Sequence, residues 1–355
     1  MRSFSFIAIA VLYCCHSATA ADMTPNALPA TATQPIPTPP PESGRITFVE
    51  ENDALVPNPT DRWYTQGAQL SYLSAPVAGP GLAAFLPSTY FDPGSFRTLR
   101  FELVFGQSIF TPQDLHLNPP DPNDRPYAAW LYAGAGLYQE TDHRSLDHVQ
   151  LLLGVVGPAA LGEEVQNGFH NLISGINSQF PSAGWESQLK NEPGVVLSYD
   201  HRWRWGGGLG AGLAADVIPE FGATIGNVFD YAEAGAMLRF GQNLSSDYGP
   251  ARIQPAFSGT AWFDPSQLQG PWGWYIFVGA QGRVVARNIF LAGNTFESSP
   301  HVTEEVLVAD LSGGVSFFWS DVAKVDLVLT WRSKEFTTQP EPDRYGGINI
   351  TFKLP

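Results

Sequence analysis

Hydrophobic and polar residues alternate along most of the chain after residue 43. In one stretch, the apolar residues Leu99, Phe101 and Leu103 are separated by Arg100 and Glu102. Because successive side chains of a β-strand point to opposite faces, this pattern predicts strands with one face in an apolar medium and the other in a polar one. The pattern recurs in residues 195–204, 232–240, 307–319, 323–332 and 348–354.

Twelve such segments can be counted along the chain. They begin near Arg45, Tyr64, Thr98, Ala128, His148, Val195, Gly208, Phe229, Trp274, Glu304, Val322 and Tyr345. A soluble β-sandwich would show the same alternation, but segments of about ten residues with charged residues on one face are typical of a membrane barrel. An even strand number also suits closure, which removes edges that lipid cannot satisfy. We therefore predict an all-β fold, a closed antiparallel transmembrane β-barrel of about 12 strands over residues 44–355.

Two regions interrupt the alternation. The link from Gly241 to Trp272 is long for a periplasmic turn, and residues 256–263 within it are a candidate extension of a strand. Between the fifth and sixth segments the period becomes that of an amphipathic helix in an extracellular loop, with an apolar stripe of Leu161, Val165, Phe169, Leu172 and Ile176. The opposite side collects Glu163, Gln166, Asn167, His170 and Ser174, and Gly175 is a plausible C-terminal cap. If the apolar stripe packs on the barrel wall, the polar side looks elsewhere; if the stripe contacts lipid, the polar side looks back at the wall.

The N-terminus has the three parts of a secretory signal peptide. Met1 and Arg2 precede an apolar run, and small residues follow as far as Ala20, so we expect residues 1–20 to be removed. Residues 21–43 are rich in Pro, Thr and Ala and predict a flexible periplasmic tether. Both cysteines, Cys14 and Cys15, lie in the signal peptide. The remaining chain therefore offers no disulfide, cysteine nucleophile or thiolate metal site.

Composition narrows the class of partner. A net charge of −15 argues against nucleic acid. No run of about 18 apolar residues follows the signal peptide, which argues against a helical membrane span. Abundant aromatic residues and glycines with few charged residues fit a β-rich chain that faces lipid. The sequence thus predicts a membrane-embedded protein of the Gram-negative outer membrane, which we expect to be a monomer.

The motif-like runs of the chain gather on one predicted side of the membrane. If the first strand starts in the periplasm, the links 54–63, 108–127 and 158–192 emerge on the outer side. With their strand ends they contain FVEENDALVPNPTDRWYTQG, GQSIFTPQDLHLNPPDPNDRPYAAW and GVVGPAALGEEVQNGFHNLISG. This clustering predicts an active site at the outer rim.

These runs resemble the outer-membrane lipid A 3′-O-deacylase family, often called LpxR. The resemblance rests on END with TDRWYTQG, then NDRPYAAWLYAGAG, GVVGP and EEVQNGFH in that order, and it covers residues 45–355. It implies a twelve-stranded barrel, dependence on Ca²⁺, and hydrolysis of the acyl groups ester-linked at the 3′ position of lipid A. The implied partner is lipid A or lipopolysaccharide.

The resemblance also implies the site residues. His170 matches the family's helix histidine, the base that activates water, and Gln166 matches the glutamine one turn earlier. Asn52 and Asp53 match residues at the end of the first strand, and Thr65 matches the threonine at the start of the second strand, near the calcium. A hard cation prefers oxygen ligands such as the Asp53 carboxylate and can polarise an ester carbonyl, so no serine nucleophile is required.

The chain departs from the family pattern at two places. The family's glutamate six residues after the helix histidine is Ile176 here, and Glu164 or Glu192 is a candidate substitute. The basic residues of the loop between the third and fourth strands are missing from DLHLNPPDPNDRPY. In that loop, Asp124 and Arg125 predict a structural ion pair or a loop contact, with Arg125 as an alternative partner for a lipid A phosphate.

Three functions compete at this point. The first is a calcium-dependent ester hydrolase that removes 3′-linked acyl chains from lipid A in the outer leaflet. The second is an outer-membrane phospholipase, which would use the same chemistry on a different head group. The third is a non-catalytic lipid-binding or calcium-binding barrel or a pore, with which the predicted interior charges Arg100, Glu102, Lys324 and Asp326 are compatible.

Overall fold

A computed structural model describes residues 42–57, 62–77, 86–87, 94, 96–173, 182–253, 255 and 260–355. For residues 169–173 it describes the backbone alone. The expected signal peptide, and all of the expected tether except its last two residues, lie outside this part. No helix within the described part is long and apolar enough to cross a membrane.

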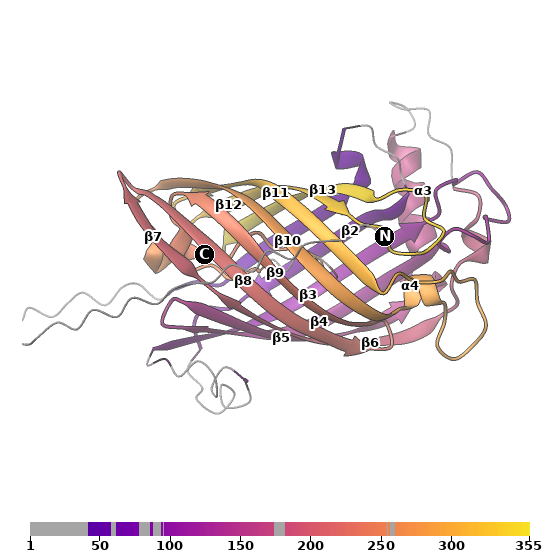
Figure 1. Cartoon of the computed structure of the whole chain (residues 1–355), viewed down its shortest axis with the longest axis horizontal. Helices are drawn as coiled ribbons and strands as arrows, with labels where there is room; N and C mark the ends of the chain where they lie inside the picture. Colours follow the sequence, from indigo (N-terminus) through magenta and orange to yellow (C-terminus); the bar gives the residue numbers. More distant parts are fainter. Residues whose placement is uncertain are drawn as a thin grey trace, which may run out of the picture. The chain divides into compact units, whose positions relative to one another are not determined.

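The strands belong to one antiparallel sheet that closes on itself (Figure 1). The strands are β1 Arg45–Asn52, β2 Trp63–Leu73, β3 Arg97–Thr111, β4 Ala128–Thr141, β5 Ser145–Val156, β6 Glu192–Trp203, β7 Trp205–Gly210, β8 Leu213–Gly226, β9 Phe229–Gly241, β10 Trp272–Asn288, β11 Leu307–Trp319, β12 Ala323–Arg332 and β13 Asp343–Lys353. The helices are η1 Asp53–Leu55, η2 Pro158–Ala160, α3 Gly162–Ile173, η3 Trp185–Ser187, η4 Leu244–Ser246, η5 Pro265–Gln267 and α4 Ile289–Ala292. Pairing of β1 with both β2 and β13, and of β6 with β8, closes the barrel.

The predicted twelve-stranded barrel is confirmed, with one correction to the strand boundaries. β7 continues β6 beyond Arg204, because both pair with β8 in a single register in which Arg202 faces Glu220 and Trp205 faces Val217. Gly208, expected to start a strand, therefore lies near the end of one, and the next strand starts at Leu213. The run GGGLGAG has too few side chains to show an alternation, which explains the misplaced boundary.

The outward face of the barrel is apolar. Its exposed large side chains include Phe48, Leu70, Phe101, Leu103, Phe105, Leu151, Leu153, Leu238, Ile276, Leu327 and Leu329. Trp272 and Trp319 stack at the periplasmic end with ring centroids 5.7 Å apart. An apolar band that ends in aromatic residues is the surface that a barrel presents to lipid.

The inward face is polar, and many of its described charges form ion pairs. Arg283 and Arg332 both donate to the Asp310 carboxylate at 2.9 Å. Arg239 donates to Asp216 at 2.6 Å and also to Asp247. Because charges buried in a narrow lumen lose hydration, such pairing is what makes their burial tolerable.

The long link between β9 and β10 enters the lumen instead of extending a strand. Arg252 from this link donates to Glu51, and Trp262 and Phe263 are buried in an apolar cluster. Of the residues expected to form a strand, 260–263 make one isolated bridge, between Phe263 and Asp247, and 256–259 lie outside the described part. The link packs on the inward side chains of the barrel, so its bulky residues fill the interior.

The ion pairs of the lumen lead to a test of stability. Replacing Arg239 by Leu leaves the Asp216 carboxylate buried without its partner, and we expect a loss of about 3–5 kcal/mol in the free energy of unfolding. Urea titration of the barrel in detergent micelles measures this loss. Arg344→Leu is the matched control, since this arginine is exposed and forms no salt bridge within the described residues. Equal stability of the two variants would contradict the proposed role of the pairing.

Candidate functional site

The outer end of β1 brings Asn52 and Asp53 to the rim of the barrel. Asn52 caps η1 by accepting the backbone N–H of Ala54 at 2.7 Å. Asp53 is 1% exposed, and its Oδ2 accepts the backbone N–H of Arg62 at 2.6 Å. These contacts fix the carboxylate of Asp53 and explain why an asparagine and an aspartate stand at this turn.

Helix η1 folds back against the outer end of β13. Gly346 of β13 approaches so closely that a Cβ there would lie 2.8 Å from the carbonyl oxygen of Leu55. A larger side chain at position 346 would therefore push η1 away from the wall. The glycine holds the turn that carries Asn52 and Asp53.

Thr65 lies beside these residues on β2. The register pairs Asn52 with Gln66, so Asp53 and Thr65 are the next residues along their strands. Thr65 falls at a bulge in the pairing of β2 with β3, and its Oγ1 lies 2.7 Å from Oγ1 of Thr111. The structure thus brings together Asn52, Asp53 and Thr65, as the sequence predicts.

Three polar side chains interrupt the apolar outward face at this end. Glu50 and Asn52 follow Phe48 on the outward side of β1, and Gln66 precedes Leu70 on the outward side of β2. Nε2 of Gln66 donates to Oε1 of Glu50 at 3.3 Å. The sequence analysis did not identify Glu50 and Gln66. The change from apolar to polar residues at the outward positions after Phe48 could have indicated them. We call Glu50, Asn52 and Gln66 the outward polar group.

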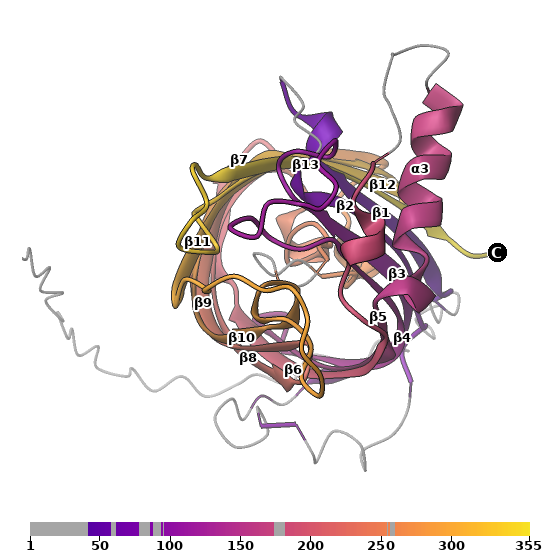
Figure 2. The ribbon, with the colours of Figure 1, turned by 90° about the vertical axis from the view of Figure 1, so that its right-hand side faces the viewer.

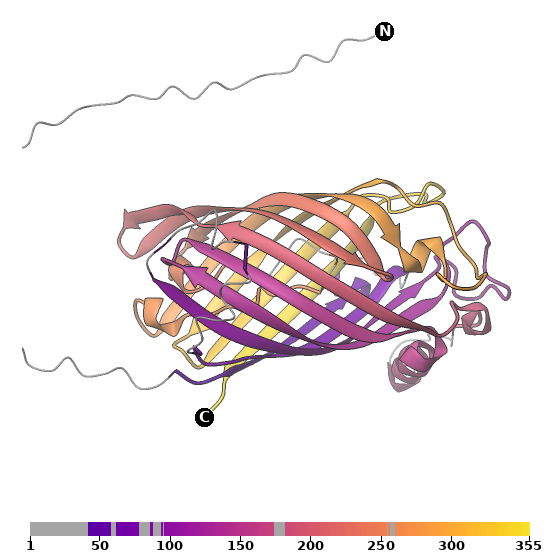
Figure 3. The same ribbon diagram turned by 90° about the horizontal axis from the view of Figure 1, so that it is seen from below.

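Helix α3 lies outside the ring of strands, against β3 and β4 (Figure 2). Nε2 of Gln107 on β3 donates to the carbonyl of Ala160, just before the helix, at 2.6 Å. Figure 3 shows α3 at one end of the barrel and the C-terminus at the other. The helix is therefore fixed to the outer part of the wall.

Gln166, on the polar side of α3, faces the protein. Gln166 is buried, and its Oε1 accepts hydrogen bonds from Nε1 of Trp185 at 2.9 Å and from Oγ of Ser182 at 3.1 Å. Leu161 and Val165 are 48% and 36% exposed. For the part of the helix whose side chains the structure describes, this agrees with the packing in which the apolar residues point away from the protein and Gln166 points towards it. The reason is that Trp185 and Ser182 offer donors that Gln166 can satisfy only by turning inward.

His170 lies in α3, one turn after Gln166. The position of its side chain lies outside the described part of the structure, as do residues Ser174, Gly175 and Ile176. The structure therefore describes the helix that carries the expected base. The distance from its imidazole to Asp53 stays a prediction.

The arginine expected to contact a substrate phosphate is inside the barrel. Arg125 is fully buried, with Nη1 3.2 Å from Oε2 of Glu335 and its guanidinium over the ring of Phe110. Burial lowers the pKa of Arg125, while Glu335 opposes this effect. Of the two structural roles expected for Asp124 with Arg125, the structure has the loop contact, because Asp124 accepts the backbone N–H groups of Arg125 at 2.8 Å and of Gln113 at 2.6 Å. This placement gives no support to a role in phosphate binding.

The candidate substitutes for the family glutamate have different surroundings. Glu164 is exposed on α3. Glu192 accepts the backbone N–H of Thr295 at 2.7 Å and a side-chain hydrogen bond from Asn227 at 2.8 Å, so it serves to join loops.

Arg344, which the sequence analysis did not single out, is exposed on the outward face of β13 near η1.

The donor atoms at this rim are oxygens. They are the carboxylates of Asp53 and Glu50, the amide oxygen of Asn52 and the hydroxyls of Thr65 and Thr111. Hard cations such as Ca²⁺ take carboxylate, amide carbonyl and other oxygen ligands. Asp53, Thr65 and Thr111 are buried, whereas Glu50 and Asn52 lie on the outward face, so these oxygens come from both sides of the wall. The type of donor atom suits the cation that the resemblance implies.

Comparison with known proteins identifies the family. The family model described as outer membrane protein LpxR matches residues 7–354. The solved structure of LpxR from Salmonella typhimurium is similar with a TM-score of 0.69 at 21% identity, and the match covers 87% of this chain and 100% of that chain. The β domain of the Bordetella autotransporter Brka has a TM-score of 0.41 at 9% identity, covering 88% of this chain and 98% of that chain, which is too distant to support an argument. No curated protein matches the chain.

At 21% identity the Salmonella structure supports the fold alone, a barrel of the same architecture. The family match extends over nearly the whole chain and includes every residue of the rim described above. The outward apolar band, the paired charges of the lumen and the closed sheet agree with that match. The chain therefore belongs to the LpxR family of outer membrane proteins and is located in the outer membrane of Gram-negative bacteria.

Proposed function

We propose that this protein is a calcium-dependent ester hydrolase that removes 3′-linked acyl chains from lipid A in the outer leaflet. In this proposal His170 activates water and Asp53 helps to hold the metal. Membership of the LpxR family supports the proposal. So does the placement of Asn52, Asp53 and Thr65 at the outer rim, beside α3.

The observation that carries the proposal is the outward polar group, Glu50, Asn52 and Gln66. Polar side chains on the outward face of a barrel cost free energy when they meet acyl chains, and this cost falls towards the interface. At the outer end they can instead meet the polar head group and ester carbonyls of a lipid. A substrate that sits in the membrane beside the wall reaches them without entering the lumen.

The reaction follows from the chemistry of an ester. His170 accepts a proton from water as the water oxygen bonds to the ester carbonyl carbon. The bond between that carbon and the 3′ oxygen then breaks, and the proton returns to the departing oxygen. The products are a fatty acid and a free 3′ hydroxyl. A bound Ca²⁺ would polarise the carbonyl and stabilise the negative charge on its oxygen.

Gln166 acts in this proposal as a positioning residue. It has no free side-chain oxygen to offer a substrate, because Oε1 is already occupied by Trp185 and Ser182. These two hydrogen bonds fix the rotation of α3 one turn before His170. The exposed Leu161 and Val165 are then available to contact acyl chains.

The alternatives have weaker support. The described residues of the link between β9 and β10 pack inside the lumen, and a cavity of about 30 Å³ beside Glu102 and His148 has room for about one or two waters. This interior does not suit a wide pore. A phospholipase would use the same rim, and the choice of substrate in the assays below separates it from a lipid A deacylase.

The proposed base has a direct test. His170→Ala is expected to lower the rate of deacylation by about 10²–10⁴-fold, the contribution typical of a general base. Mass spectrometry of lipid A from outer membranes that contain each variant gives the readout. His116→Ala, a change in an exposed loop histidine, is the control and keeps the wild-type rate. Equal loss of acyl chains from His170→Ala and wild type would rule out this base.

The metal can be tested by removal and return. Chelation is expected to stop deacylation, and Ca²⁺ is expected to restore it while Mg²⁺ is not, because Mg²⁺ demands a stricter octahedral site. Asp53→Asn should require at least about ten-fold more Ca²⁺ for half-maximal activity, since it loses a charged ligand. Glu163→Gln, an exposed change on α3, is the matched control. Full activity in the chelator would contradict the metal requirement.

Hydrolysis of phosphatidylethanolamine in place of lipid A would favour the phospholipase.

Variants of Gln166 test whether this residue acts by holding α3 in position. Gln166→Ala removes two buried hydrogen bonds and leaves the Trp185 and Ser182 donors unsatisfied, which costs about 1–3 kcal/mol each at such a site. We expect faster hydrogen exchange of the α3 amides together with slower deacylation. Gln166→Glu keeps an acceptor oxygen and should restore both. Unchanged exchange in Gln166→Ala would show that these bonds do not hold the helix.

A further inference from the structure

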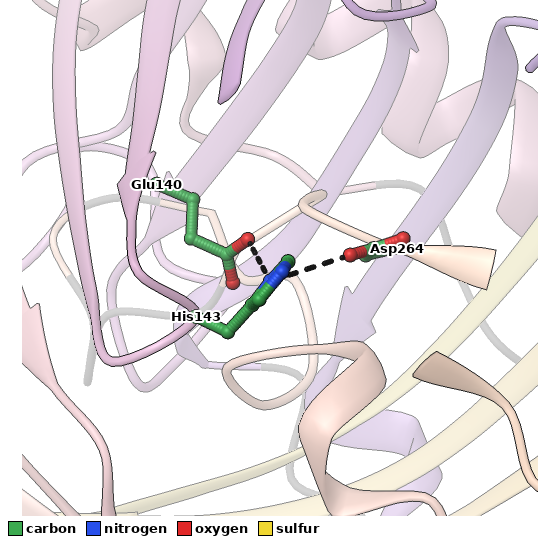
Figure 4. A group of neighbouring side chains, drawn as sticks. All are labelled: Glu140, His143 and Asp264. Atoms are coloured by element: carbon green, nitrogen blue, oxygen red, sulfur yellow. Dashed lines mark hydrogen bonds and ion pairs between the residues drawn. The ribbon is translucent and has the colours of Figure 1, made fainter. Parts of the chain in front are cut away.

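A second group of metal-ligating side chains lies at the periplasmic end of the barrel. Glu140 is near the end of β4, His143 is in the turn between β4 and β5, and Asp264 caps η5 in the link that enters the lumen (Figure 4). One potential ligand atom from each residue lies within 4.8 Å of the other two. The candidate lipid site is at the opposite end of the strands.

The distances in this group suit a metal ion. Nδ1 of His143 lies 2.8 Å from Oε2 of Glu140 and 3.5 Å from Oδ2 of Asp264. Ligand atoms held at about 2.0–2.2 Å from a metal ion are separated from one another by about 2.8–3.6 Å. The two distances from His143 lie in this range, and the ligand atoms of Glu140 and Asp264 lie within 4.8 Å of each other.

Glu140 supplies an independent indication that the group can accept a further ligand. Its side chain is 1% exposed, and within the described residues its Oε1 has no hydrogen bond of good geometry, although the hydroxyl of Tyr248 faces this carboxylate. A buried carboxylate with an unsatisfied oxygen is costly. The single hydrogen of His143 Nδ1 can point at one carboxylate at a time, so it cannot satisfy both Glu140 and Asp264.

The neighbouring arginine does not fill this gap. Nη1 of Arg204 is 3.9 Å from Oε1 of Glu140, beyond hydrogen-bond distance. Arg204 is instead held by the carbonyls of His143 at 2.9 Å and Asp247 at 2.6 Å, and it stacks on the ring of Tyr248. Its positive charge lowers the affinity for a cation. The two carboxylates of Glu140 and Asp264 offset that effect.

The group can be reached from the periplasm. The His143 side chain is 34% exposed, and it lines a cavity of about 540 Å³ together with Arg144, Gly206 and Asn243. An ion held by three protein ligands would keep open positions for water on this side. Imidazole nitrogen with carboxylate oxygens is a donor set that Zn²⁺ accepts.

We propose that Glu140, His143 and Asp264 form a site for a divalent transition metal ion, with Zn²⁺ as the best fit. The ion joins the β4–β5 turn to the link that fills the lumen. Its function is to fasten this link at the periplasmic mouth. This site is independent of the proposed hydrolysis of lipid A.

Zn²⁺ binding to the full chain in detergent micelles tests the proposal. After removal of metals by a chelator and its dialysis, isothermal titration with ZnCl₂ is compared between wild type, His143→Gln and Asp264→Asn. Heat-dependent migration on gels first establishes that each variant is folded. His116→Gln, which removes an exposed histidine of an outer loop, is the matched control.

We expect wild type and His116→Gln to bind one more equivalent of Zn²⁺ than either site variant, or to bind it at least ten-fold more tightly. Zn²⁺ should also raise the unfolding temperature of wild type and not that of His143→Gln. Identical titrations for wild type and both site variants would overturn the proposal. So would the absence of Zn²⁺ binding to wild type, which would leave His143 as a hydrogen-bond partner of two carboxylates.

Discussion

Closure of the sheet is the constraint on which the rest of this structure depends. Lipid offers no hydrogen bonds, so every backbone N–H and C=O within the membrane must be paired inside the protein. Pairing of β1 with β13 and of β6 with β8 meets this requirement. It also fixes which alternate side chains of every strand point outward and which point inward, since one face of a closed wall meets lipid and the other meets the lumen.

Parity in turn explains where the charges are. Arginines and carboxylates on the inward face lose hydration in a narrow lumen, and they are tolerated because they pair with one another, as Arg283 and Arg332 do with Asp310. The link between β9 and β10 adds Arg252 and further apolar side chains to this interior. These side chains pack together inside the barrel, and the proposed site for the lipid lies on the outside.

The candidate site breaks the same parity rule at the outer rim. Glu50, Asn52 and Gln66 face outward where apolar residues would be more stable, and α3 turns Leu161 and Val165 to lipid while Gln166 is buried. A local loss of stability is expected where a wall must contact the polar part of a lipid. The closed hydrogen-bonded sheet of the rest of the barrel is stable enough to tolerate this local loss.

The sequence by itself determined the features that depend on neighbours along the chain. The alternation of apolar and polar residues predicted the twelve-stranded wall, and the helical period predicted α3. The motifs at the strand ends predicted that Asn52, Asp53 and Thr65 lie at one rim. Tertiary structure decided what depends on distant partners. Arg125 is buried because Glu335, more than two hundred residues away, pairs with it inside the barrel. Likewise, the meeting of His143 with Asp264 follows from the path of a link whose sequence has no regular period, and a local pattern cannot encode such a path.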